Sequence, residues 1–361
     1  MTLEAWRQLA LAPPRAWGDP QASGVLRAVP EDFVVEEDLG FAPDGDGAHL
    51  LLKVRKRNAN TGWVAQELAR ALGCPVRDVG FAGLKDRRAV AIQWFSLPAT
   101  PRSLAGAPDL QNPEFVVLEA HRHRRKLPRG ALAGNAFTVR IRAYSGSDEA
   151  LRERCAVMAA AGVPNYFGPQ RFGRDAANLA RLLASASAAS TTRRAGRPDG
   201  FVLSAARSLI FNAVLGERVR QGSWGTLAVG DVGNLDGRGS VFAVPELTAD
   251  LPERLAQLQI HPTGPMWGAG ELRSRGAPLE LEQRVAEQLP TACEFTIAAG
   301  VRQERRSLRL KVRDLQWQRD REGIVLRFWL RSGSFATGVI REILSDRSAP
   351  NESLIVDADD V

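Results

Sequence analysis

Cysteine is scarce in this chain of 361 residues, which contains three cysteines far apart in the sequence, Cys74, Cys155 and Cys293. This spacing encodes neither a disulfide framework nor a zinc knuckle. Long apolar runs are absent too, since no stretch approaches the roughly 18 residues that span a membrane. The N-terminal segment also lacks the apolar core of a secretory signal. These absences predict a cytoplasmic protein that does not enter a membrane.

Lysine is similarly rare, with five lysines among 48 basic residues, which outnumber the 41 acidic residues and give a net charge of +7. A basic surplus is typical of proteins that bind an anionic partner, most often nucleic acid, although an evenly spread charge is an equal alternative. The hydrophobic fraction of 44% and the charged fraction of 25% are those of a globular protein with a core. The length indicates two domains, or one domain with a large insertion.

Strand patterns lie toward both ends of the chain, and helical patterns dominate its middle. The predicted strands are 30–40, 49–55, 79–84, 89–97, 114–121, 137–142, 307–312 and 324–330. The predicted helices are 58–72, 147–162, 175–184, 203–220, 279–289 and 335–344. Between them, 185–200 is typical of a flexible loop and 231–269 is rich in glycine and proline. Strand-rich ends that enclose a helical block indicate a discontinuous α+β domain with an insertion.

A cluster of cations lies between His121 and Arg142, where the chain carries no acidic residue. Like charges so close in sequence repel one another unless an anion offsets them. One interpretation is a surface that contacts the phosphate backbone of a nucleic acid; the other is a solvated basic loop. The members of the cluster are Arg122, Arg124, Arg125, Lys126, Arg129, Arg140 and Arg142.

The segment GFAGLKDRRAV (80–90) places one carboxylate, Asp86, among the cations Lys85, Arg87 and Arg88. Neighbouring cations favour the ionised form of an acid. A carboxylate held as an anion on a loop between strands can act as a nucleophile or a base. The alternative is an ordinary turn, in which aspartate is a common residue.

Two further segments carry candidate binding residues. Asn135 has the same parity as Phe137 in the alternating segment 137–142, so a strand that begins early enough would project its amide from an apolar face. That amide could meet a base, a ribose, a carboxylate or only the backbone. Phe335 lies at the start of a predicted helix, where its ring could stack on a base or fill the core.

Other motifs are missing or incomplete. The chain has no GxxxxGK[ST] phosphate loop, no serine elbow and no Cys–His pair in a supporting context. His121 and His123 share a strand face but lack an evident third ligand, so no metal site is expected. No cofactor is expected either.

Six segments in this order resemble the tRNA pseudouridine synthase D family. They span the chain from about residue 25 to about residue 345. The segments are PEDFVVEEDLGF (30–41), GFAGLKDRRAV with Gln93-Trp94 (80–94), KLPRGALAGNAF (126–137), GVPNYFGPQRFG (162–173), LSAARS (203–208) and FWLRSGSFATGVIRE (328–342).

The resemblance implies an α+β fold with a catalytic domain built on a mixed, mainly antiparallel sheet and interrupted by a family-specific, mainly helical insertion domain. The catalytic domain would comprise residues 1–161 and 307–361, and the insertion would comprise 162–306. The implied reaction is the isomerisation of uridine to pseudouridine at position 13 of transfer RNA, with no metal or organic cofactor. The implied partner is transfer RNA; no protein partner is implied, and the chain gives no oligomer signal, which favours a monomer.

The resemblance also implies roles for individual residues. Asp86 matches the essential aspartate, which would attack the ribose or the base or abstract the C2′ proton. Asn135 would orient the aspartate or the uridine. Phe33, Phe137 and Phe335 match positions around the nucleotide pocket, and Lys85 would act electrostatically beside the aspartate. A non-catalytic RNA-binding protein and a metal-dependent nuclease are the rival functions, and the segment around Asp86 argues against the first.

Overall fold

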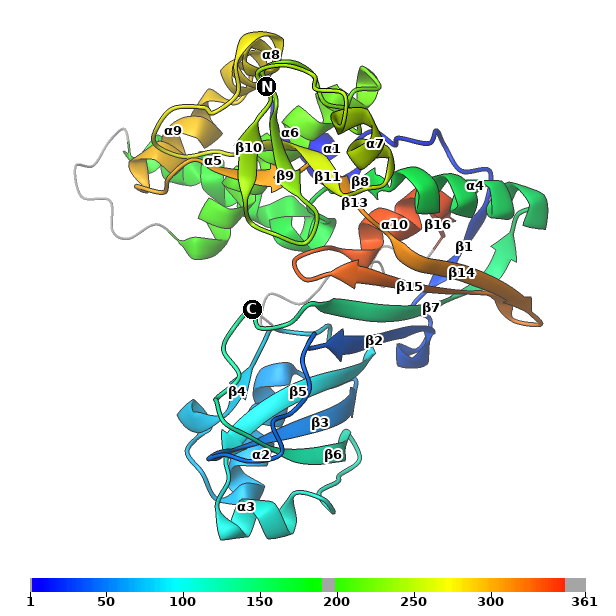
Figure 1. Ribbon diagram of the computed structural model, residues 1–361, viewed down its shortest axis with the longest axis vertical. Coiled ribbons are helices and arrows are strands. Elements are labelled where there is room, and N and C mark those ends of the chain that lie inside the picture. The colour runs from blue at the N-terminus through cyan, green and yellow to red at the C-terminus, as the bar shows by residue number, and fades with distance from the viewer. Residues whose placement is uncertain (1, 190–198, 348–361) are drawn as a thin grey trace. The chain divides into compact units, whose positions relative to one another are not determined.

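A computed structural model describes residues 2–189 and 199–347. The chain divides into two compact units. The sheet unit comprises Ala22–Gly146, Arg313–Gly333 and 345–347, and the helical unit comprises 2–21, Ser147–Val312 and Ser334–Leu344. Each unit is therefore built from segments that lie far apart in the sequence (Figure 1).

A ten-stranded sheet forms the described part of the sheet unit. The central strands follow the order β14-β15-β7-β2-β5-β3-β6, and β1, β4 and β16 attach to the side of this path. The pairs β2–β5 and β1–β16 are parallel and the other pairs are antiparallel, which confirms the prediction of a mixed, mainly antiparallel sheet. The strands are β1 (Ser23–Leu26), β2 (Phe33–Asp38), β3 (His49–Arg57), β4 (Gly80–Phe81), β5 (Val90–Pro98), β6 (Phe115–His123), β7 (Gly134–Ser145), β14 (Arg313–Asp320), β15 (Gly323–Arg331) and β16 (Ser345–Asp346).

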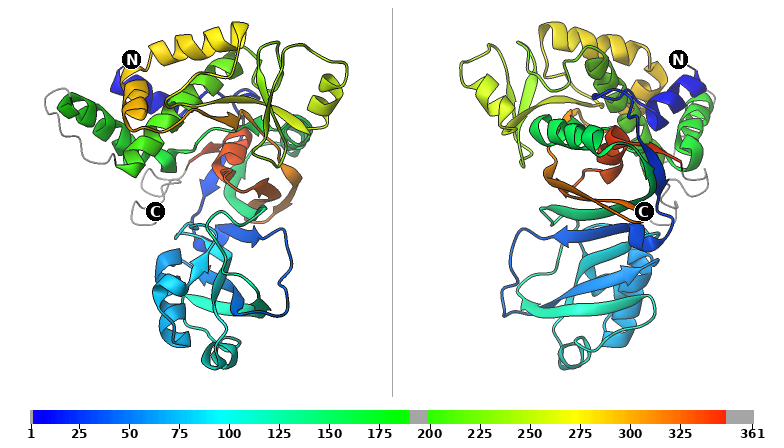
Figure 2. Two further views of the ribbon diagram at one scale, coloured as in Figure 1. Left: turned by 60° about the vertical axis from the view of Figure 1, so that its left-hand side comes forward. Right: turned by 90° about the vertical axis from the view of Figure 1, so that its right-hand side faces the viewer.

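Two helices, α2 (Thr61–Leu72) and α3 (Pro101–Gly106), pack on one face of this sheet at the end formed by β3, β5 and β6 (Figure 2). The predicted apolar stripe of α2 is buried against strands β3, β5 and β6. The helix ends at Gly73, whose φ of +71° is the left-handed conformation that glycine adopts without steric cost. This packing holds the start of α2 against the loop that carries Asp86.

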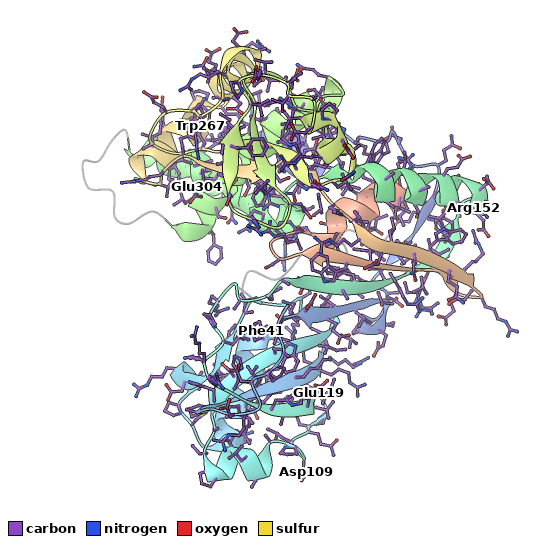
Figure 3. All side chains as sticks on the ribbon, viewed as in Figure 1. Phe41, Asp109, Glu119, Arg152, Trp267 and Glu304 are labelled. Carbon is purple, nitrogen blue, oxygen red and sulfur yellow. The ribbon has the colours of Figure 1, made fainter. Side chains whose placement is uncertain are left out.

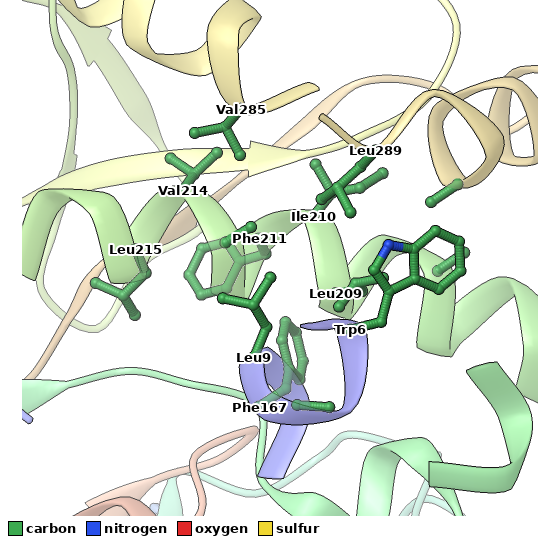
Figure 4. Packing of buried hydrophobic residues seen from close by; sticks show 14 of the residues in the cluster. Trp6, Leu9, Phe167, Leu209, Ile210, Phe211, Val214, Leu215, Val285 and Leu289 are labelled. Atoms are coloured by element: carbon green, nitrogen blue, oxygen red, sulfur yellow. The ribbon is translucent and has the colours of Figure 1, made fainter. Parts of the chain in front are cut away.

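The long helix α6 (Gly200–Arg220) forms the centre of the helical unit. Its residues Leu209, Ile210 and Phe211 are fully buried, and Trp6 and Leu9 of the N-terminal helix pack beside them (Figure 4). A helix buried on nearly all sides in this way is typical of the core of a larger unit. The other helices are α1 (Leu3–Leu11), α4 (Asp148–Ala161), α5 (Ala177–Ala189), α7 (Leu251–Ala256), α8 (Gly276–Glu287), α9 (Pro290–Ala298) and α10 (Ala336–Ile343).

The helical unit also contains strands in the segment rich in glycine and proline, where the sequence predicted none. A four-stranded sheet has the order β10-β9-β11-β12, with β9 (Val232–Leu235), β10 (Val241–Ala243), β11 (Ile260–Met266) and β12 (Glu304–Ser307). The first half of β11 pairs with β9 and the second half pairs with β12. Each half is therefore paired along one edge, and strand edges tolerate proline, which has no N–H to donate. A short pair joins β8 (Val163–Pro164) to β13 (Arg309–Leu310).

Several predicted boundaries differ from the observed ones. The expected loop 185–200 begins later, because α5 continues to Ala189; residues 190–198 lie outside the described part. The compact units change at Ser147 and Val312, whereas the predicted insertion runs from 162 to 306. The division into catalytic and insertion domains at those residues stays a prediction. None of the described helices is both long and apolar enough to cross a membrane.

Candidate active site

Asp86 lies on a loop, residues 82–89, that connects β4 to β5 in the sheet unit. β4 is antiparallel to β5, with Phe81 opposite Phe95, so the chain between them leaves the sheet and returns to it at Val90. This loop is longer than the two-residue turn of a tight hairpin. Its carboxylate is partly accessible, since 23% of the Asp86 side chain is exposed.

A buried lysine from β3 anchors this loop. Lys56 Nζ donates to the carbonyl oxygens of Ala59 at 2.6 Å, Asp86 at 3.1 Å and Lys85 at 3.3 Å. A charged donor makes stronger hydrogen bonds to carbonyl groups than a neutral one. Lys56, which has no exposed surface, therefore fixes the backbone at Asp86 and at the residue before it.

Lys85 joins the loop to its neighbours rather than to Asp86. Its Nζ lies 2.5 Å from Oε1 of the buried Glu37 on β2, and the other oxygen of that carboxylate accepts a hydrogen bond from the Trp94 N–H. The backbone N–H of Lys85 donates to Thr61 Oγ1 at the start of α2, at 3.1 Å. In this structure Lys85 is thus a structural link, and its predicted electrostatic role toward a substrate stays a prediction.

The cation that pairs with Asp86 is Arg27, which sequence reasoning missed. Arg27 Nη2 lies 2.7 Å from Asp86 Oδ2, and 7% of the Arg27 side chain is exposed. Arg27 follows β1 in the connection to β2, and its φ of +53° is unusual for a residue with a side chain. Backbone strain of this kind gathers at functional sites. A single arginine 59 positions away from Asp86 offers no motif that could have revealed the pair.

Aromatic rings support Arg27 from one side. The guanidinium carbon lies 4.0 Å from the centre of the Phe33 ring, a cation–π geometry. Phe33 meets Phe137 edge to face at 5.9 Å, and Phe137 stacks on Phe328 at 5.3 Å. Phe33 and Phe137 are both buried, and their predicted place beside the nucleotide stays a prediction.

Asn135 lies in the strand with the parity that the sequence suggested. β7 begins at Gly134, and Asn135 is opposite Glu37 of β2 and Leu330 of β15. Its Oδ1 is buried and accepts no hydrogen bond from the described residues. Because buried polar atoms are nearly always paired, this oxygen is suited to a partner that binds from outside the protein.

Phe335 belongs to the helical unit, unlike the other candidate residues. It precedes α10, and its ring lies 6.0 Å from the ring of Phe167 and 5.8 Å from the guanidinium carbon of Arg171. The ring is partly exposed. Its structural surroundings are therefore a group of aromatic and cationic side chains within that unit.

The arginines predicted to contact an RNA backbone differ in their partners. Arg124 Nε lies 3.0 Å from Asp46 Oδ1, and Arg122 Nη2 donates to the carbonyl of Gly47 at 2.9 Å. Arg125 is exposed and forms no hydrogen bond or ion pair with another described residue. Part of the charge that seemed unopposed in the sequence is therefore offset by a loop from elsewhere in the chain.

Lys126 and Arg129 lie on a segment that packs next to the Asp86 loop. Lys126 Nζ donates to the carbonyl of Arg77 at 2.6 Å. The guanidinium carbon of Arg129 lies 3.8 Å from the centre of the Phe81 ring, at the start of that loop. Both side chains already contribute to local structure, and their contact with RNA stays a prediction. The described residues hold no group of three or more His, Cys, Asp or Glu side chains arranged to bind a metal.

The chain that carries this site also matches a known protein family. The model of the family described as tRNA pseudouridine synthase D matches residues 14–182 and 199–343. The chain belongs to this family. It is 43% identical to the tRNA pseudouridine synthase D of Xanthomonas axonopodis, with 91% of this chain and 94% of the relative covered.

A second relative is the tRNA pseudouridine synthase D of Pseudomonas putida KT2440. It is also 43% identical, with 95% of this chain and 97% of the relative covered. A crystal structure from Methanosarcina mazei, described as a tRNA pseudouridine synthase D, superposes with a TM-score of 0.72 at 22% identity. It covers 96% of this chain and 98% of its own, and at that identity it supports the fold alone.

Proposed function

We propose that this chain isomerises uridine to pseudouridine in transfer RNA, with position 13 as the expected site. In this reaction the C1′–N1 bond breaks, the uracil rotates, and C5 bonds to C1′. C5 loses a proton and N1 gains one, so neither an oxidant nor a reductant is consumed. The observation that carries the proposal is the accessible Asp86 carboxylate, held by Arg27 on an anchored loop in a chain of this family.

Asp86 is the proposed catalytic residue. Arg27 holds its carboxylate in one orientation at 2.7 Å, and the backbone at Asp86 is fixed by Lys56. Such preorganisation is what a reacting carboxylate needs, because small displacements of a catalytic group are costly. The carboxylate can attack the ribose, attack the base, or remove the C2′ proton, and all three require an anion within reach of the nucleotide.

Asn135 is the proposed contact to the uridine. Asp86 already bonds to Arg27, whereas the Asn135 carbonyl oxygen is buried and has no partner in the described chain. A uracil N3–H or a ribose hydroxyl could supply the missing donor. Phe33 and Phe137 are proposed to line the nucleotide pocket, and Phe33 also holds Arg27 in place.

The target uridine has to leave its stack to reach Asp86. Extruding a base costs a few kcal/mol and costs least in irregular RNA. Stacking of a base on an aromatic ring contributes about 1–3 kcal/mol, and Phe335 is proposed to bind the RNA by such a contact in the helical unit. The proposed backbone contacts Arg122, Arg124, Arg125, Lys126 and Arg129 would make binding sensitive to salt.

The remaining features of the proposal concern the whole protein. The proposed setting is the cytoplasm, with the chain acting as a monomer and without a cofactor. The proposed catalytic domain comprises 1–161 and 307–361, and the proposed insertion comprises 162–306.

The test is to incubate the purified protein with unmodified transfer RNA and to map pseudouridine by carbodiimide-dependent stops of reverse transcription. The expected result is one new stop that reports position 13. Retention of the RNA without any isomerised uridine would favour a non-catalytic RNA-binding protein instead. Activity that persists in EDTA would dismiss a metal-dependent nuclease.

A further inference from the structure

Arg171, in the helical unit, is a partly buried cation whose role the proposed chemistry does not explain. It lies in the 3-10 turn η3 (Pro169–Phe172). Its Nη1 donates to Ser204 Oγ at 3.0 Å, and its guanidinium carbon lies 5.3 Å from the Phe167 ring and 5.8 Å from the Phe335 ring. No described carboxylate forms an ion pair with it. Burial lowers the pKa of Arg171.

A second arginine adds to the positive charge at this place. The guanidinium carbon of Arg306 lies 4.3 Å from the same Phe167 ring, and its Nη2 donates to Asn165 Oδ1 at 2.8 Å. Burial, followed by the nearby charge of Arg171, lowers the pKa of Arg306 to about 10. The partly buried charge of Arg171, which no described carboxylate offsets, would be stabilised by a bound anion.

Hydrogen bonds and close packing hold the backbone at Phe167 and Gly168, just before Arg171. Asn212, which is fully buried on α6, accepts from the Phe167 N–H at 2.9 Å and donates to the Phe167 carbonyl at 3.0 Å. Thr337 Oγ1 and Gln170 Oε1 would lie 2.7 Å and 2.5 Å from a Cβ atom added at Gly168, so the chain is closely packed there.

Two polar atoms at this place lack partners in the described part of the chain. They are Thr337 Oγ1 and Gln170 Oε1, and 7% of Thr337 is exposed. The hydroxyl of Thr337 can donate a hydrogen bond to an anion. A buried hydroxyl without a described partner, beside Gly168, which lies three residues before Arg171 in the chain, is the second feature that favours a ligand at this place.

We propose that Arg171, with Arg306 beside it, binds a phosphate group of the RNA substrate next to a nucleotide whose base stacks on Phe335. This inference rests on the proposed function, since it takes transfer RNA as the ligand. Guanidinium groups bind phosphate through paired N–H donors, and arginine is the residue best suited to this contact. Arg171 is thus a substrate-positioning residue, because its contact lies on the RNA backbone.

The experiment compares Arg171→Gln and Arg171→Lys in the full chain with the control Arg220→Gln. Arg220 is an exposed arginine of the same unit that pairs with Glu217 three residues earlier on α6. Affinity for an unmodified transfer RNA transcript is measured by filter binding over a series of salt concentrations. The melting temperature of each variant verifies that it folds.

Arg171→Gln should weaken RNA binding by about tenfold and reduce the slope of log K against log salt by about one, as expected for one lost phosphate contact. Arg171→Lys should keep the slope but bind less tightly, because lysine cannot make the paired contact. The rate at saturating RNA should stay near the wild-type value in both variants. Arg220→Gln should change neither the affinity nor the slope.

Wild-type affinity and slope in a folded Arg171→Gln would overturn the inference, as would an Arg171→Lys variant whose slope also falls by about one. Failure of the proposed function is distinguishable from this result, because the binding assay does not depend on pseudouridine. A wild-type protein that binds RNA but forms no product would end the proposed reaction, while the Arg171 measurement would still decide the phosphate contact.

Discussion

The pairing of Asp86 with Arg27 decides how the candidate site works at the scale of single residues. The cations next to Asp86 in the sequence do not pair with it in the structure. Lys85 instead binds Glu37, and the contact at 2.7 Å comes from Arg27, whose side chain rests on Phe33. The environment that keeps the carboxylate in place is therefore assembled from distant strands.

Replacement of Arg27 by glutamine should slow the reaction more than it weakens RNA binding. Loss of the guanidinium frees the Asp86 carboxylate to rotate, and misplacement of a catalytic group by about 1 Å can cost about 100-fold in rate. Single-turnover formation of pseudouridine at saturating transfer RNA measures this effect. Arg27→Lys should recover part of the rate, because it keeps the charge but not the planar geometry.

Arg55→Gln is the matched control for that experiment. Arg55 is an exposed arginine on β3 of the same unit. Its replacement should leave the single-turnover rate unchanged. Equal rates for Arg27→Gln and Arg55→Gln would contradict the positioning role of Arg27.

The sequence identified some site residues and missed others for a physical reason. The cations around Asp86, and the alternation that puts Asn135 on the same strand face as Phe137, can be recognised from a few neighbouring residues. Arg27, Lys56 and Glu37 act on the same loop but come from three other parts of the sheet unit. Their contribution depends on strand order and register, which local patterns do not encode.

At the scale of elements, the segment that contains the predicted RNA-binding cations is tied to a second loop of the sheet unit. Arg122 and Arg124 bind the loop residues Gly47 and Asp46, whereas Arg125 is exposed and forms no hydrogen bond or ion pair with the other described residues. A cation that is already paired gives up part of its attraction for phosphate. The three arginines should therefore contribute unequally to RNA binding.

Arg125→Gln should reduce the salt dependence of transfer RNA binding more than Arg124→Gln does. The first variant removes a fully available charge and should lower the slope of log K against log salt by about one. The second leaves Asp46 unpaired, so its net effect on the slope should be smaller. Binding titrations at several salt concentrations give both slopes; equal slopes, or no change in either, would argue against the structural difference between the two side chains.

Elements with strong local periodicity were predicted well. The stripe of α2 and the alternation of β7 both correspond to buried faces in the structure. The strands β9 and β11 were missed because glycine and proline interrupt their pattern, and β10 was missed because it has three residues; pairing with other strands stabilises them instead. β4 is shorter than predicted because only Gly80 and Phe81 pair with β5.

At the scale of the whole molecule, the basic surplus is spread more widely than the sequence suggested. The seven cations between residues 121 and 142 equal the net charge of +7, but several of them pair with acidic residues from other segments. Arg140 binds Asp320 at 2.6 Å and Arg142 binds Asp32 at 2.8 Å. The surplus of positive charge is therefore not confined to the segment 121–142. Arg171 in the helical unit is one further cation that is proposed to bind the RNA.

A buried histidine should make the stability of the protein depend on pH. His261, which is 2% exposed, accepts from Arg309 Nε through Nδ1 at 3.0 Å, and its Nε2 lies 3.2 Å from Asp236 Oδ1. Burial lowers the pKa of His261; the hydrogen bond to Asp236 opposes this effect and the charge of Arg309 adds to it. The unfolded chain therefore binds a proton more readily than the folded chain. Stability should fall as the pH drops below about 6.5, by up to about 1.4 kcal/mol per pH unit.

The variant His261→Gln isolates this contribution. The glutamine amide can accept from Arg309 and donate to Asp236, but it does not titrate. The melting temperature of the variant should lie below that of the wild type at about pH 7.5, and the gap should narrow toward about pH 5.5 as the wild type loses stability. A gap that stays constant over that range would show that His261 does not contribute.

The substitution Asp86→Asn tests the central claim most directly. Asparagine keeps the size of the side chain and can still accept from Arg27, but it lacks the anionic carboxylate. Single-turnover formation of pseudouridine and affinity for transfer RNA are measured together, with Asp109→Asn as the control. Asp109 is an exposed carboxylate of the same unit (Figure 3). The account predicts no product from Asp86→Asn, nearly wild-type RNA affinity, and full activity from the control; product formation by Asp86→Asn at the wild-type rate would contradict it.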